Sequence, residues 1–223
     1  MREIVLDTET TGLEPRTGDR IVEIGCVELV NHVATGETFH RYVNPERDMP
    51  AEAFAVHKLS EEFLRGYPVF AELADEFVEF LGDAPLVIHN AEFDMKFINA
   101  ELGRLDRPIL PMSRTIDTLT LARRKFPGAA ASLDALCRRF DIDLAERTQH
   151  GALLDARLLA EVYLELSGGR QPGLGLASAA AVQQADTPVP RVSRPPRPHA
   201  PTEAELAAHE AFIETLPEAV WKR

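Results

Sequence analysis

Three extended segments within the first 44 residues constrain the fold of this chain more than any other feature. The segments "EIVLDTET" (3–10), "RIVEIGCVELV" (20–30) and "ATGETFHRYVN" (34–44) alternate well enough to pair as antiparallel strands. A short buried strand at 85–90 then follows an amphipathic helix at 70–82 and precedes further helices. This order predicts an α/β domain in which helices pack on a mixed sheet.

The rest of the chain divides into helices, a linker and a tail. Helices are expected at 92–105, 117–126, 132–140 and 152–166, and we assign residues 1–169 to the α/β domain. The next segment, 170–201, is rich in Gly, Ala and Pro and has no repeating apolar face. That composition is typical of a flexible linker, which is stiffer where the prolines cluster.

The tail, residues 202–223, regains a helical pattern to about Leu216 after a Thr202 cap. A lone helix of this length is marginal in water, yet this one would carry several large apolar side chains. These are Leu206, Phe212, Ile213 and Trp221. A frayed tail is one interpretation. A docking peptide that folds on a partner is better supported, because exposed aromatic side chains are otherwise unfavourable.

The charge balance limits the class of function without deciding it. The chain is 45% hydrophobic and 27% charged, with a net charge of −12. This acidity argues against a conventional DNA-binding protein, which would carry a basic face. It does not exclude a nucleic-acid enzyme, because carboxylates gathered around divalent cations invert the local sign of the charge.

Membrane insertion and secretion are not indicated. No apolar run approaches the roughly 20 residues that cross a bilayer, and the N-terminus starts directly with a strand pattern instead of a signal peptide. Cys26 and Cys137 lie in apolar patterns and are expected to be buried thiols. That usage suits a reducing cytoplasm.

Four carboxylates from three segments have the composition of a metal site. Asp7 and Glu9 are two apart on the first strand, so their side chains leave the same face. Asp94 follows the buried strand at 85–90, and Asp155 lies about one turn into a helix. Such an acidic group is tolerable when cations lie between its members. Two Mg²⁺ or Mn²⁺ ions, which prefer oxygen ligands, could then hydrolyse a phosphodiester.

His150 can join this group only if the last helix begins after it. On a continuous helix it would point about 140° away from Asp155, whereas Gly151 allows a corner between loop and helix. Imidazole can take a proton from an attacking water at neutral pH, so we predict His150 as the general base. A lone histidine is more often structural, and only the set of five residues makes the prediction strong.

Three motifs resemble those of the DEDDh family of 3′→5′ exonucleases. They are "VLDTETTG", "VIHNAEFD" and "HGALLD". The resemblance covers the chain except for the linker, and it implies an RNase H-like fold with a mixed five-stranded sheet flanked by helices. It also implies that Asp7, Glu9, Asp94 and Asp155 hold two divalent ions, with Asp7 bridging them, and that His150 is the general base.

The resemblance further implies a set of substrate contacts. Glu52 and His57 would contact the terminal nucleotide, and Leu13 and Phe93 would grip the frayed base. Main-chain groups around Thr10–Gly12 could approach the 3′ end, since glycine permits close contact. The full substrate-binding set is Asp7, Glu9, Thr10, Gly12, Leu13, Glu52, His57, Phe93 and Asp155. Four of these residues also have an interpretation without a role in substrate binding. Glu52 could lie on a solvated loop, His57 at the edge of the core, and Leu13 and Phe93 in the core.

Two positions depart from the family pattern. Glu92 adds a charge beside Asp94, where the family more often has a small residue. It would either point to solvent at the helix start, where a carboxylate is favourable, or point inward and change metal affinity. Second, "QPGLGL" (171–176) stands where a sliding-clamp-binding peptide is expected, with Gln171, Leu174 and Leu176 as contacts. Leu176 replaces an aromatic residue there, and plain linker is the alternative.

Taken together, the residues and the resemblance predict a metal-dependent 3′→5′ exodeoxyribonuclease. It would proofread the primer terminus for a replicative DNA polymerase and release 5′-mononucleotides. The tail would dock on the catalytic subunit through Leu206, Phe212 and Trp221, and a small third subunit is a further candidate partner. The rival interpretations are a free-standing exonuclease that trims RNA and a non-catalytic adaptor that stabilises the polymerase.

Overall fold

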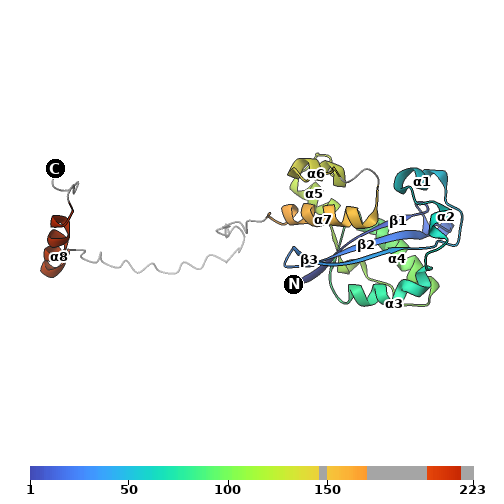
Figure 1. Cartoon of the computed structure of the whole chain (residues 1–223), viewed down its shortest axis with the longest axis horizontal. Helices are drawn as coiled ribbons and strands as arrows, with labels where there is room; N and C mark the ends of the chain where they lie inside the picture. Colours follow the sequence, from blue (N-terminus) through green and yellow to red (C-terminus); the bar gives the residue numbers. More distant parts are fainter. Residues whose placement is uncertain (146–149, 170–199, 217–223) are drawn as a thin grey trace, which may run out of the picture. The chain divides into compact units, whose positions relative to one another are not determined.

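The computed structural model describes residues 1–145, 150–169 and 200–216. The described residues form two units, one with every element from β1 to α7 and one with α8 (Figure 1). We describe each unit by itself. The expected partner-binding residues Gln171, Leu174, Leu176 and Trp221 lie outside the described residues.

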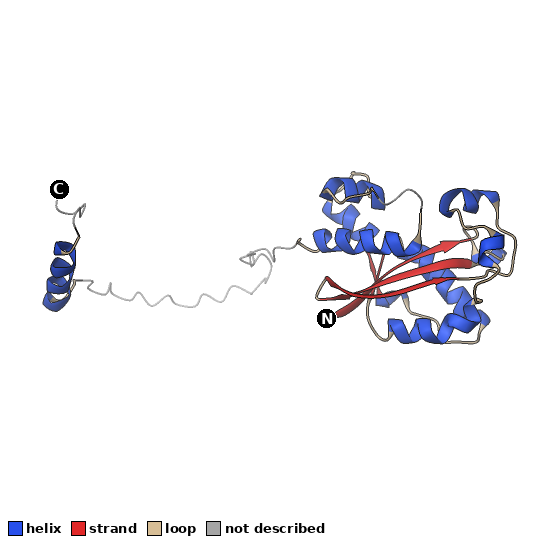
Figure 2. Ribbon diagram, viewed as in Figure 1, coloured by secondary structure: helices blue, strands red, loops and turns tan. Residues whose placement is uncertain are grey.

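A five-stranded mixed sheet forms the centre of the first unit (Figure 2). Its strands are β1 (Arg2–Thr10), β2 (Ile21–Val30), β3 (Val33–Tyr42), β4 (Leu86–Ile88) and β5 (Thr115–Asp117). The order is β3-β2-β1-β4-β5, in which the β3-β2-β1 pairs are antiparallel and the β1-β4-β5 pairs are parallel. The predicted mixed sheet is confirmed. The sequence does not locate β5, because its three residues, Thr115–Asp117, do not form an apolar run like that of the equally short β4.

The helices of the first unit lie on both faces of this sheet. They are α1 (Ala51–His57), α2 (Glu61–Leu64), α3 (Phe70–Leu81), α4 (Ala91–Arg104), α5 (Thr118–Lys125), α6 (Leu133–Phe140) and α7 (Ala152–Leu166). Two short 3-10 helices, η1 (Pro15–Thr17) and η2 (Met112–Arg114), complete the unit. The five longer helices match the sequence prediction, whereas α1 and α2 are too short to give a clear helical period.

Successive residues of β1 face opposite helical layers. Ile4 and Leu6 belong to the apolar cluster formed with α3 and α4, whereas Val5 belongs to the cluster formed with α5, α6 and α7. Side chains two apart on a strand share a face. Asp7 and Glu9 therefore lie on the same face as Val5, the face that α7 covers.

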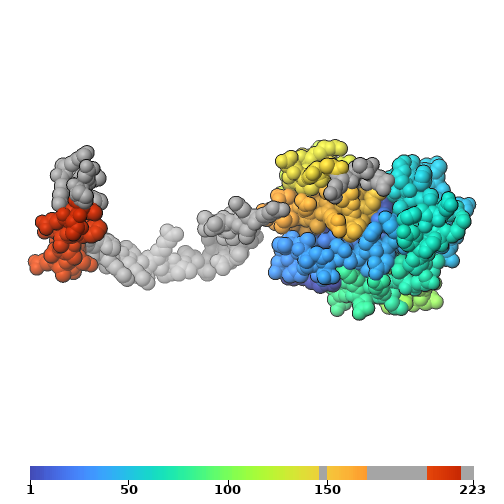
Figure 3. Space-filling view, viewed as in Figure 1, coloured from blue at the N-terminus to red at the C-terminus, as the bar shows by residue number. Residues whose placement is uncertain are grey.

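Gly25 lets α7 approach the sheet at the level of the acidic residues. It is the β2 residue paired with Asp7, and a Cβ atom at this position would overlap the main chain of Ala152 and Leu153. The space-filling view shows α7, in orange, directly against the blue surface of the early strands (Figure 3). Because glycine has no side chain, the first turn of α7 can lie beside Asp7.

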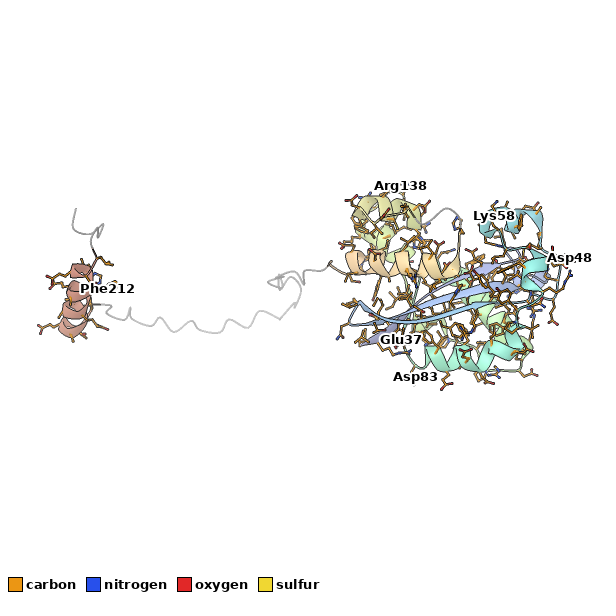
Figure 4. All side chains as sticks on the ribbon, in the orientation of Figure 1. Glu37, Asp48, Lys58, Asp83, Arg138 and Phe212 are labelled. Atoms are coloured by element: carbon orange, nitrogen blue, oxygen red, sulfur yellow. The ribbon has the colours of Figure 1, made fainter. Side chains whose placement is uncertain are left out.

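The second unit contains α8 (Glu203–Glu214). Its N-terminus has a capping box, in which the Thr202 hydroxyl accepts from the Glu205 amide and Glu205 accepts from the Thr202 amide. The predicted Thr202 cap and helix are confirmed. Leu206 and Phe212 are exposed, the latter by 62% of its surface (Figure 4). None of the described helices is long and apolar enough to cross a membrane.

Candidate active site

The centre of the site is the C-terminal half of β1. Asp7 and Glu9 are partly buried and leave the same face, opposite Gly25 and Glu23 of β2. The register shifts between Glu9 and Thr10, which ends regular pairing with β2 just past the two carboxylates. The strand therefore presents two acidic side chains side by side where the chain turns away from the sheet.

The start of α7 supplies two more of the predicted residues. His150 is exposed and precedes the N-cap residue Gly151, whose extended backbone turns the chain into the helix. Asp155 is 3% exposed, and its amide closes the first turn on the Gly151 carbonyl. The Nδ1 atom of His150 lies 3.2 Å from Oδ2 of Asp155. The histidine thus stands on the loop before the helix and still meets the aspartate, as the sequence requires.

Glu9 meets these two residues across the sheet–helix boundary. Ligand atoms of Glu9, His150 and Asp155 all lie within 4.8 Å of one another. Glu9 and His150 are 141 positions apart in sequence, yet a single cation could contact both. This grouping includes the histidine, which the sequence assigns to proton transfer instead of metal binding.

Asp94 enters the site from the opposite layer. It lies in the first turn of α4, which begins after Asn90 at a left-handed φ of 66°. The side chain is 3% exposed, and its Oδ1 accepts hydrogen bonds from the amide and hydroxyl of Thr8 at 3.1 and 2.7 Å. Thr8 lies between Asp7 and Glu9, so these bonds place Asp94 at the same end of β1.

The carboxylates strongly influence one another's protonation. Burial raises the pKa of Asp7 well above its ordinary value, and the negative charges of Asp94, Glu9, Asp155 and Glu23 raise it further. Burial also raises the pKa of Asp94 to about 7, although the hydrogen bonds from Thr8 oppose this shift. Clustered carboxylates that resist ionisation become favourable ligands when a divalent cation supplies the missing positive charge. The oxygen-rich donor set fits Mg²⁺ or Mn²⁺.

His57 lies next to this acidic group. It is buried at the end of α1, and its Nδ1 accepts from the Leu59 amide at 3.0 Å. Burial lowers the pKa of His57, the Thr10 main chain and Glu23 oppose this, and the nearby charge of His150 lowers it further. His57 therefore belongs to the same neighbourhood as His150.

The other expected substrate-contacting residues differ in exposure. Glu52 is exposed in the first turn of α1; it is solvated, as its alternative interpretation expects, but it lies on a helix and not on a loop. Leu13 is 76% exposed, which excludes the core alternative for this residue. Phe93 is partly buried against the core on α4. Glu92 is exposed at the start of α4, which is the solvent-facing arrangement of the two considered.

The loop that carries Thr10, Gly12 and Leu13 is tightly closed. The Thr10 hydroxyl donates to the Gly12 carbonyl at 2.6 Å, and a Cβ atom on Gly12 would overlap the Asp19 carboxylate. Asp19 in turn accepts from the Glu14 amide and the Thr11 hydroxyl. A larger residue at position 12 would therefore have to displace the Asp19 side chain.

Glu23 is a further acidic residue that the sequence reasoning does not include in the site. It is buried on β2 opposite Glu9, and its Oε1 lies 2.7 Å from Nε2 of His40. Its charge raises the pKa of Asp7. The available signal is an acidic residue within the apolar run "IVEIGC", because a buried strand seldom carries a carboxylate without a partner.

Comparisons with known proteins agree with this geometry. A family profile described as Exonuclease matches residues 4–163. The DNA polymerase III subunit epsilon of Rickettsia conorii is 50% identical over 97% of this chain and 96% of its own length. The Escherichia coli subunit epsilon is 46% identical over 96% of this chain and 93% of its own length.

Solved structures of exonucleases share the fold. Exonuclease X in complex with 5′-overhanging duplex DNA has a TM-score of 0.58 at 26% identity, over 73% of this chain and 89% of that one. The nuclease domain of 3'hExo, a DEDDh family member bound to rAMP, has a TM-score of 0.64 at 19% identity, over 75% of this chain and 92% of that one.

The fold, the acidic site and the family profile together define a nuclease of the exonuclease family. Within that family, the chain belongs to the epsilon subunits of DNA polymerase III. This membership makes it a metal-dependent 3′→5′ exonuclease that works with a replicative polymerase.

Proposed function

We propose that Asp7, Glu9, Asp94 and Asp155 would hold two divalent ions, Mg²⁺ or Mn²⁺. The observation that carries this proposal is the convergence of the carboxylates. Ligand atoms of Glu9 and Asp155 lie within 4.8 Å of each other, and Asp94 accepts two hydrogen bonds from Thr8, which lies between Asp7 and Glu9. When bound, the ions would activate water and stabilise the charge that develops on the phosphodiester oxygens. A non-catalytic adaptor would not need to retain the complete set of carboxylates.

His150 is the group that we assign to proton transfer. Its Nδ1 lies 3.2 Å from the Asp155 carboxylate, which orients the ring and leaves Nε2 as the nitrogen for the attacking water. Asp155 would thus act both on a cation and on the imidazole. The exposed position of His150 on a loop allows the ring to reach the substrate without a fixed ligand role.

The substrate is a frayed 3′ end of DNA. We assign Leu13 and Phe93 to contacts with the frayed terminal base, and Glu52 and His57 to the terminal nucleotide. The main chain of Thr10 and Gly12 would approach the same nucleotide. A mispaired end needs less unpairing energy to enter such a site, so it would be removed faster than a paired end. The products would be 5′-mononucleotides.

The arrangement of the chain suits a tethered nuclease. We assign residues 1–169 to the nuclease, 170–201 to a linker and 202–223 to a tail that docks on the polymerase III alpha catalytic subunit. The exposed Leu206 and Phe212 of α8 support this assignment. A linker would keep the nuclease at a high effective concentration beside the primer end while it moves.

Two further assembly contacts follow from the same assignment. Residues 171–176 would bind the sliding clamp, and a small theta-like subunit is a further candidate partner of the nuclease domain. Cys26 and Cys137 are both buried thiols. Reduced thiols of this kind suit the cytoplasm, where we expect the chain to act.

The test is Mg²⁺-dependent release of nucleotides from a primer with a mismatched 3′ end, compared with a paired primer. We expect faster loss from the mismatched end, abolished by Asp7→Ala and reduced at least a hundredfold, the usual worth of a general base, by His150→Ala. Asp83→Ala is the matched control, because Asp83 is an exposed carboxylate in the turn between α3 and β4 (Figure 4). Metal-independent activity, or full activity of Asp7→Ala, would overturn the proposal.

A further inference from the structure

Lys96 joins the two segments that carry the proposed grip on the terminal base. It lies in the second turn of α4, and its Nζ donates to the main-chain carbonyl of Leu13 at 2.6 Å. The same atom lies 3.8 Å from the Glu14 carboxylate. A single ammonium group therefore connects α4 to the tip of the loop that follows β1, across 83 residues of sequence.

The same ammonium group also lies against the aromatic side of the grip. Its Nζ is 5.3 Å from the centre of the Phe93 ring and 5.7 Å from that of Phe97. The two rings are themselves 5.1 Å apart. Because a cation is attracted to aromatic faces, Lys96 holds a defined position over Phe93 while it binds the Leu13 carbonyl. One side chain thus contacts both Leu13 and Phe93.

The base of the loop is fixed independently of Lys96. Asp19 holds the turn through Glu14, and Arg20 makes a two-point ion pair with the buried Glu101 at 2.7 and 2.9 Å. The tip instead presents a Leu13 side chain that is 76% exposed. A large apolar side chain that a fixed loop holds in solvent can bind a ligand that covers it. A nucleotide base is such a ligand, because it has a flat apolar face.

We propose that Lys96 is a positioning residue for 3′-terminal nucleotide binding, acting through Leu13 and Phe93 and not on the reacting atoms. This inference rests on the proposed function, because it takes the terminal base as the object that Leu13 and Phe93 hold. It predicts that loss of the Lys96 ammonium weakens nucleotide binding and leaves the hydrolytic step intact. Asp94, two residues earlier, keeps its bonds to Thr8 without any contribution from Lys96.

The experiment compares Lys96→Met with Lys96→Arg in the full-length chain. Methionine keeps the aliphatic stem and removes the charge, whereas arginine keeps a donor that can reach the Leu13 carbonyl. For Lys96→Met we expect KM on a single-stranded oligonucleotide to rise about fivefold to tenfold, the worth of one partly exposed charge-assisted hydrogen bond. The kcat should stay within about twofold, as for loss of an interaction that is equal in the ground and transition states. Lys96→Arg should restore KM.

Two further measurements separate positioning from a general structural role. The inhibition constant of the product dTMP should rise in parallel with KM, since the product occupies the same grip. In a Leu13→Ala background, Lys96→Met should have little additional effect on KM, because the group that it positions is gone. A fall in kcat equal to the rise in KM, or full additivity with Leu13→Ala, would overturn the inference.

Failure of the proposed function would look different. It would appear in the unmodified chain as an absence of metal-dependent nucleotide release. An unchanged KM and unchanged dTMP inhibition in Lys96→Met, with an active unmodified chain, would instead reject only the role of Lys96.

Discussion

Asp94 accepts hydrogen bonds from both the amide and the hydroxyl of Thr8, at 3.1 and 2.7 Å. The two residues come from different layers and are 86 positions apart in sequence. Because Thr8 lies between two acidic residues of β1, these bonds fix the position of Asp94 relative to Asp7 and Glu9. They also favour the ionised form of a carboxyl group whose pKa burial has raised to about 7.

Substitution of Thr8 by valine should therefore weaken metal binding. Without the hydroxyl the pKa of Asp94 rises further, so more of it is protonated at neutral pH and a cation must displace that proton. We expect the Mg²⁺ concentration for half-maximal nuclease activity to rise about tenfold, because a hydrogen bond to a charged group is worth about 1.5–3 kcal/mol. Activity should recover partly at higher pH. Thr38→Val, on the exposed part of β3, is the control; an equal effect there would contradict the explanation.

The metal-free protein should lose stability as the pH rises toward neutrality. Burial raises the pKa of Asp94 to about 7 and that of Asp7 well above its ordinary value, whereas the unfolded chain titrates such groups near 4. Between about pH 4 and 7 the folded chain thus binds more protons than the unfolded chain, so the free energy of unfolding falls as the pH increases.

Thermal unfolding in EDTA checks this expectation. We expect the melting temperature to fall between pH 5 and pH 8 on the order of 5 °C, and Mg²⁺ to raise it most at pH 8, where the carboxylates are most ionised. Asp94→Asn should flatten the pH dependence, because that group no longer ionises. A metal-free melting temperature that rises with pH over this range would show that other groups dominate.

Gly25→Ala should disturb both stability and catalysis. A methyl group at this position would overlap the main chain of Ala152 and Leu153, so α7 must move away from β2 together with His150 and Asp155. We expect a loss of about 1–3 kcal/mol in the free energy of unfolding, the usual cost of overpacking, and a large loss of kcat.

Gly103→Ala is the matched control for this prediction. Gly103 lies within α4 and has open space around its Cα atom. Alanine there should be neutral or stabilise the chain by up to about 1 kcal/mol through helix propensity. Chemical denaturation and single-turnover kinetics of both variants provide the comparison. A normal kcat in Gly25→Ala would show that catalysis does not depend on the close approach of α7 to β2.

Phe212→Ala should separate polymerase binding from nuclease activity. The side chain is 62% exposed on α8, which belongs to a different unit from the one that holds the acidic site. We expect the Kd for the polymerase catalytic subunit to rise at least about tenfold, as for an aromatic anchor in an interface, with unchanged hydrolysis of single-stranded DNA. Glu214→Ala, an exposed residue of the same helix, is the control. Equal binding by Phe212→Ala and the unmodified chain, in surface plasmon resonance, would reject this anchor.

Much of the fold follows from local patterns in the sequence. The alternation in β1, β2 and β3 and the helical periods of α3 to α7 are properties of segments, because side-chain direction repeats every 2 or 3.6 residues. The same alternation places Asp7 and Glu9 on one face. The start of α7 after His150 also follows locally, from Gly151 and the apolar pattern behind it. The short α1 and α2 carry too few repeats to be located in this way, and the three residues of β5 do not form an apolar run.

Local patterns are enough to predict the mixed sheet, its helices and the chemical character of the site: four carboxylates and a histidine in motifs of one nuclease family. They do not reveal that Glu23 lies beside these acidic groups, that Leu13 is exposed, or that Lys96 reaches the Leu13 carbonyl. The difference is one of distance along the chain. Periodicity fixes where a side chain points on its own element, whereas contacts between Thr8 and Asp94 or Leu13 and Lys96 depend on how helices dock on the sheet. That docking is set by the packing of the whole core and by the space that Gly25 leaves open.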